Sequence, residues 1–161
     1  MDIIYRELLK QQFEHLIQEF ELEGVLPSPV MRNTRVIAAI DGIRKAGIKD
    51  RYLLAIDTDR FPIEAFDVGF LDPRCEPLSQ QTAPMKDRRW FPDDGEQRFK
   101  TAFPKEPHVF VCIDPGFSRE YFIHHTQESW NPQYWSLLEV VRQIRNALSS
   151  NVYRGPMWEK Q

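Results

Sequence analysis

Residues 61–73, "FPIEAFDVGFLDP", combine a turn with the pattern of a β-strand. A Phe-Pro turn is followed by Phe66, Val68 and Phe70 at every second position, which is the period of a β-strand with one buried face. The closing proline then stops the strand, because proline has no amide hydrogen to donate to a sheet. We therefore predict a turn followed by a strand over residues 65–73.

Strands are also predicted on both sides of this stretch. The segments "RVIAAIDGI" (35–43) and "RYLLAIDTD" (51–59) are rich in branched residues and are joined by short polar links. Three strands with short connections predict an antiparallel meander. Further on, "HVFVCID" (108–114) has strand character again, and "REYFIHH" (119–125) is placed to pair with it as a hairpin.

An amphipathic helix is predicted at each end of the chain. Over residues 3–23 the apolar side chains recur at steps of three and four, and Gly24 provides the stop. These apolar residues are Leu9, Phe13, Leu16, Ile17 and Phe20. The second helix is predicted to begin near Pro132 and to end by Asn151. Its apolar residues are Leu137, Val141, Ile144 and Leu148.

Residues 74–107 have no sustained period and contain five prolines among polar and charged residues. We predict a long irregular segment, either an insertion or a segment that flanks a site. The element order is helix, meander, irregular segment, strand or hairpin, and helix. This order predicts an α+β fold in a single domain over residues 1–161.

The charge, the apolar content and the number of cysteines argue against several classes of protein. The net charge is −3, from 21 basic and 24 acidic residues, so no broad basic field exists to attract nucleic acid or an anionic membrane. No apolar run approaches the roughly 20 residues that cross a bilayer, and the N-terminus lacks a signal-peptide pattern. Two cysteines cannot form a disulfide framework. We expect a cytoplasmic protein with free thiols and no cofactor.

Several local motifs, in their order along the chain, resemble the ubiquitin-conjugating enzyme (UBC) family. The turn and strand of the family are matched by Phe61-Pro62-Ile63, Val68, Phe70 and Pro73. Its Trp-Ser-Pro before a long helix is similar to Trp130-Asn131-Pro132, and its catalytic Ile-Cys-Leu-Asp is similar to Val111-Cys112-Ile113-Asp114. The family's His-Pro-Asn element is missing, and only Pro107-His108 stands upstream. The resemblance covers about residues 3–151 and implies the UBC fold.

The resemblance also implies an activity. A ubiquitin-like protein would pass from an activating enzyme to Cys112 as a thioester and then to a target amine. Divergent stand-alone chains of this kind resemble members of bacterial conjugation operons, some of which serve anti-phage (antiviral) defence. In the family, the exposed face of the first helix and the Phe-Pro turn contact partners. The corresponding residues here are Arg6, Lys10, Glu14, Phe61 and Pro62.

The transfer requires a thiolate, an oxyanion donor and an acid or base near the attacking amine. Cys112 is the expected nucleophile, and Asp114 lies two residues further, on the same face of a continuing strand. Donor candidates past the turn are His124, His125 and Asn131.

Other interpretations remain open. A rival alignment puts Phe122 at the nucleophile position, which is typical of cysteine-less variants that bind ubiquitin as scaffolds. Cys112 could equally be a buried residue of the core without a chemical role. A third interpretation is an α+β domain unrelated to the family, in which the short sequence matches are coincidental. A metal site is not expected, because His108 and Cys112 on one strand are about 13 Å apart.

Overall fold

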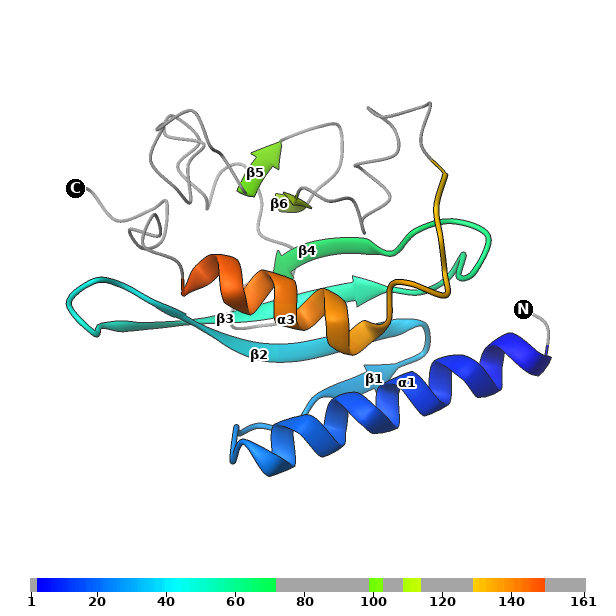
Figure 1. Cartoon of the computed structure of the whole chain (residues 1–161), viewed down its shortest axis with the longest axis horizontal. Coiled ribbons are helices and arrows are strands. Elements are labelled where there is room, and N and C mark those ends of the chain that lie inside the picture. Colours follow the sequence, from blue (N-terminus) through cyan, green and yellow to red (C-terminus); the bar gives the residue numbers. More distant parts are fainter. Residues whose placement is uncertain (1–2, 72–98, 103–108, 114–128, 150–161) are drawn as a thin grey trace.

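The computed structural model describes residues 3–71, 99–102, 109–113 and 129–149, and for the strands at 99–102 and 109–113 it describes their pairing (Figure 1). The helices are α1 (Ile3–Leu22) and α3 (Leu137–Leu148). The strands are β1 (Val30–Arg32), β2 (Arg35–Ile43), β3 (Lys49–Asp57), β4 (Asp67–Leu71), β5 (Phe99–Ala102) and β6 (Val109–Ile113). This arrangement confirms the predicted α+β class.

The strands form one sheet in the order β1-β2-β3-β4-β6-β5, with every neighbouring pair antiparallel. The predicted meander is confirmed in β2, β3 and β4, which pair in chain order. A tight turn joins the two long strands: the amide of Arg44 donates to Ile48, and Gly47 adopts φ 75°, which glycine reaches without steric cost. The Arg44–Asp50 ion pair, at 2.6 Å, closes the hairpin beside this turn.

Both helices pack on the same face of the sheet, where they enclose the main core (Figure 1). Side chains alternate between the two faces of a strand, so every second residue of β2, β3 and β4 points to the face under the helices. The strand residues in this core are Val36, Ala38, Ile40, Tyr52, Leu54, Ile56, Val68 and Phe70. The helices contribute Leu9, Leu16, Phe20, Leu137, Val140, Val141, Ile144, Ala147 and Leu148.

The two helices are also joined by polar contacts. The buried Gln12 of α1 accepts a hydrogen bond at 3.1 Å from the amide of Leu137. This amide is in the first turn of α3, where N–H groups have no acceptor within the helix itself. Ser136 caps the same helix by accepting from the amide of Glu139 at 3.2 Å. Further along, Arg142 contacts Glu19 at 2.6 Å, and Arg145 contacts Glu23.

The structure corrects two predictions and adds one strand. The C-terminal helix begins at Leu137, not near Pro132, because residues 131–135 form a separate turn and Ser136 provides the cap. Part of the segment predicted to be irregular is strand β5, whose short length gives no detectable period. The three-residue β1 was not predicted at all. The predicted strand at 119–125 lies outside the described residues. Within the described part of the chain, no helix is long and apolar enough to cross a membrane.

Candidate functional site

The Phe-Pro turn and the Trp-Asn-Pro segment, far apart in sequence, are in direct contact. The indole Nε1 of Trp130 donates a hydrogen bond to the carbonyl oxygen of Pro62 at 3.0 Å. Its ring meets Phe66 edge-on with centroids 5.6 Å apart, and Phe66 stacks on Phe61 at 5.3 Å. The Phe61–Pro62 peptide bond is cis. Two segments that carry the UBC resemblance therefore form one structural unit.

Some residues of this unit are buried and others are exposed. Phe61 was predicted to contact a partner, but it is only 3% exposed and holds the turn from inside. Pro62 is half-buried. The exposed apolar residues here are Ile63, at 86%, and Tyr134, at 68%. The side chain available to a partner at this turn is therefore that of Ile63, not that of Phe61.

Asn131 lies in this unit and is exposed. Its Oδ1 accepts a hydrogen bond at 3.0 Å from the amide of Gln133, and its backbone carbonyl accepts from Tyr134. The side-chain oxygen is thus used to shape the turn, so the Nδ2 amino group is the part that can donate to a ligand.

Cys112 lies in β6, directly opposite Lys100 of β5. Because β6 runs between β4 and β5, Cys112 belongs to an inner strand of the sheet. The other predicted catalytic residues in this part of the chain, Asp114, His124 and His125, lie outside the described residues, as does the alternative Phe122.

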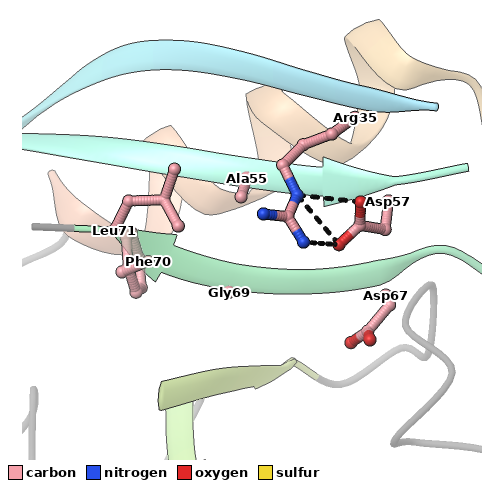
Figure 2. A pocket seen from close by; sticks show the side chains of 7 residues that line it. All are labelled: Arg35, Ala55, Asp57, Asp67, Gly69, Phe70 and Leu71. Atoms are coloured by element: carbon pink, nitrogen blue, oxygen red, sulfur yellow. Dashed lines mark hydrogen bonds and ion pairs between the residues drawn. The ribbon is translucent and has the colours of Figure 1, made fainter. Parts of the chain in front are cut away.

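A row of charged residues crosses the sheet at the end where β3 stops and β4 begins. Arg35 pairs with Asp57, and Asp57 pairs with Asp67, on three adjacent strands. The guanidinium of Arg35 binds the Asp57 carboxylate through Nε and Nη2, at 2.7 to 3.1 Å (Figure 2). Arg35 Nη1 points along the sheet towards Ala55, while the carboxylate of Asp67 points away from Asp57 (Figure 2).

These residues line a small pocket together with Ala55, Gly69, Phe70 and Leu71. Ala55 and Gly69 are paired across β3 and β4 and leave room because their side chains are small or absent. The hydrogen bond with Asp57 raises the pKa of Arg35 above its ordinary value, and the negative charge of Asp67 adds to this effect. The pocket therefore has one firmly held cation beside two acidic side chains.

The charged row lies on the face of the sheet that points away from the helices. Val36 and Ile56 belong to the core under the helices, so their neighbours Arg35 and Asp57 belong to the other face. Trp130, which precedes Asn131, packs against the core on the helix side.

Strand β6 lies beside β4, where Phe110 pairs with Gly69 and Val109 with Phe70. This pairing fixes the position of the β6 backbone in the sheet. The expected roles of Cys112 as nucleophile and of Asn131 as donor stay predictions.

The predicted partner-binding residues of α1 are Arg6, Lys10 and Glu14, and all three are exposed. Lys10 lies 4.0 Å from Glu14, one helical turn away. At this distance on a solvated face, the pair contributes little to stability. These side chains are accessible, but nothing in their geometry identifies a partner.

Sequence reasoning did not identify Arg35, Asp57 or Asp67 as candidate site residues. The signal in the sequence was weak, because each is simply a charged residue at the end of a strand. The strand register shows that the three belong to one row. Among the described residues, no group of three or more His, Cys, Asp or Glu side chains is arranged to hold a metal ion.

Comparison of the chain with protein-family models, with curated proteins and with solved structures finds no match. The functional argument therefore depends on the residues themselves.

Proposed function

We propose that this chain is a divergent ubiquitin-conjugating-enzyme-like protein that carries a ubiquitin-like protein on Cys112. The observation that carries the proposal is the hydrogen bond from Trp130 to Pro62, together with the ring contacts around it. It joins two segments that resemble the family: the turn between β3 and β4, and the segment that precedes α3. A helix, an antiparallel meander and a second helix, in that order, also agree with the UBC fold.

The chemistry is acyl transfer in two steps. The thiolate of Cys112 attacks the thioester carbonyl of the modifier on the activating enzyme, whose cysteine leaves as a thiolate. An amine of the target then attacks the new thioester, an amide bond forms, and Cys112 leaves as a thiolate after the amine has lost a proton. Sulfur suits both steps because it is nucleophilic near neutral pH and leaves readily.

The experiment is to incubate the protein with ATP and with the activating enzyme and ubiquitin-like protein of the same genome, and to follow the products on a non-reducing gel. We expect an adduct that disappears with reductant. Cys112→Ala should abolish it, and Cys112→Ser should convert it into an adduct that resists reductant. Cys75→Ser is the matched control, because it removes the only other cysteine and should leave the adduct intact.

A binding scaffold of the same fold is the second candidate. The observation that favours it is the position of Cys112 in an inner strand, paired on both sides with other strands. A scaffold would bind the modifier or the activating enzyme without forming an adduct. Binding with native affinity by Cys112→Ala, together with no adduct for the wild type, would favour this second candidate.

Within a conjugating role, the exposed surface of α1 and the turn at Pro62 and Ile63 are the proposed contacts for partner proteins. Substitution of Ile63 by Asp tests the turn, because Ile63 is 86% exposed and its replacement leaves the core intact. Ile48, which is 52% exposed in the β2–β3 turn, provides the matched control position.

A further inference from the structure

We propose that the end of the molecule formed by the last turn of α1 and the tip of the β2–β3 hairpin is an interface between two copies of this chain. In this interface, Lys45 and Lys49 of one copy face Glu21 of the other. The inference does not depend on the proposed function, because this end lies opposite the turn at Pro62 and Ile63, across the length of β3 (Figure 1).

The ends of α1 and α3 and the outer part of the β2–β3 hairpin meet at this place. Arg145 of α3 contacts Glu23, which follows α1. Arg51 of β3 pairs with Asp41 of β2 at 2.8 Å and also donates to the carbonyl oxygen of Leu26 at 2.7 Å. The hydrogen bond from Arg51 lowers the pKa of Asp41, and the positive charge of Arg145 acts on the same carboxyl. These contacts join the segments into one continuous surface.

Three exposed apolar side chains lie on this surface. Leu22 at the end of α1 is 85% exposed, Leu26 in the following loop is 71% exposed, and Ile43 at the end of β2 is 40% exposed. Ile43 and Asp41 lie on the same face of β2, so Ile43 is next to the ion pair that holds the backbone at Leu26. Apolar side chains that gather within a charged surroundings are typical of a protein–protein interface.

The end of α1 carries negative charge that one copy compensates only in part. Its last turn contains no basic residue, although the carbonyl end of a helix is itself partially negative. Arg145 compensates Glu23. For the exposed Glu21, the described part of the chain provides no ion pair. A positive charge from outside this copy would therefore be favourable beside Glu21.

The tip of the hairpin carries the opposite charge. Lys45 in the turn and Lys49 at the start of β3 are both exposed. Arg44 beside them is bound to Asp50, whereas residues 3–71 and 129–149 provide no ion pair for either lysine. In a two-fold dimer, each surface meets the same surface of the other copy, so the basic tip and the acidic helix end are brought together twice. A second copy is therefore the partner whose charges this surface matches.

The first experiment measures self-association of the full chain by sedimentation equilibrium across a wide range of protein concentration. We expect a reversible monomer–dimer equilibrium and a thermal unfolding midpoint that rises with concentration, because only folded copies associate. Leu22→Gln combined with Leu26→Ser should weaken the dimer about a hundredfold, because each change occurs twice in a two-fold interface. Ile63→Ser is the control, because Ile63 is equally exposed at the opposite end and should not affect association.

The second experiment reverses the charges. Lys45→Glu combined with Lys49→Glu, and separately Glu21→Lys, should each weaken self-association about tenfold, because like charges then face each other in both contacts. A mixture of the two variants should regain the affinity of the wild type, because each tip then meets an opposite charge. General attraction does not explain this recovery, since the wild type has a net charge of −3 and both variants also stay negative.

The proposal is overturned if the wild type is monomeric at every concentration, if the substituted variants associate as tightly as the wild type, or if the mixture does not recover. For a monomer, the Leu22→Gln, Leu26→Ser variant identifies what else covers the surface. A lower unfolding midpoint indicates a segment of the same chain, and an unchanged midpoint indicates a different protein. A dimer without the thioester adduct would refute the proposed function alone, whereas an adduct without a dimer would refute this interface alone.

Discussion

The two faces of the sheet differ in what the same strands present. Towards the helices, β2 and β3 contribute Val36, Ile40 and Ile56, which are at most 2% exposed. Towards the other face they contribute Ile37 and Ala55 in a small apolar cluster, with charged residues at both ends of it. One face is built for stability, whereas the other combines a smaller apolar area with ionisable groups, which is where chemistry is expected.

The largest expected effect compares two isoleucines of one strand. Ile40→Ala removes a side chain that is 2% exposed in the main core and should lower the free energy of unfolding by about 3–4 kcal/mol. Ile37→Ala, in the small cluster of the other face, should cost about 2 kcal/mol, because fewer apolar neighbours surround it. Urea unfolding followed by circular dichroism measures both. Equal losses would refute the distinction between the faces.

The next effect concerns the polar contact inside the helix-covered face. Gln12→Met keeps the volume but leaves the amide of Leu137 without its acceptor, and should cost about 1–2 kcal/mol. The neighbouring Gln11 is exposed, so Gln11→Met should change stability by less than about 0.5 kcal/mol. The same unfolding measurement distinguishes them, and a neutral Gln12→Met would show that the contact does not stabilise the start of α3.

A smaller effect is expected on the charged face. A double-mutant cycle with Arg35→Met and Asp57→Asn should give a coupling of about 1 kcal/mol that decreases with added salt. The exposed Arg60–Glu64 pair, spaced one helical turn in sequence, should give about 0.3–0.5 kcal/mol in the same cycle. If the two couplings are equal, the geometry of the row adds nothing to an ordinary surface pair.

The smallest effect is a pH dependence at the other end of the same face. The hydrogen bond from Arg51 holds the pKa of Asp41 below its ordinary value. The folded pKa is therefore lower than the unfolded one, so the stabilisation is present above about pH 4 and is lost as the pH falls through the folded value. In Asp41→Asn, the decrease in the free energy of unfolding between pH 6 and pH 2 should be smaller than in the wild type by at most about 0.5 kcal/mol. Unfolding measured between pH 2 and pH 6 tests it, and an identical pH profile contradicts it.

The sequence predicted those elements that have a strong local period. The bounds of β2 were predicted as 35–43 and are confirmed, and the first helix differs from its predicted range by one residue. The start of α3 was misplaced because the Trp130–Asn131 turn has a good helix-initiating proline but is held by tertiary contacts instead. Strand β5 was missed because its four residues are too few to show a period.

The candidate site was less predictable for the same reason. Cys112 was singled out by its local motif, whereas Arg35, Asp57 and Asp67 lie side by side only through the register of β2, β3 and β4. A change of one residue in that register would move the side chains of a strand to the opposite face. The roles of Cys112, and those expected for Asp114, His124 and His125, remain predictions.

The position of β6 between β4 and β5 has a consequence for how the sheet is assembled. In the described part of the chain, β5 joins the sheet only through β6. Strands β5 and β6 are consecutive and antiparallel, so they can pair with each other before β6 docks on β4. The contact between β4 and β6 is therefore what attaches both strands to the meander, and its loss would detach them together.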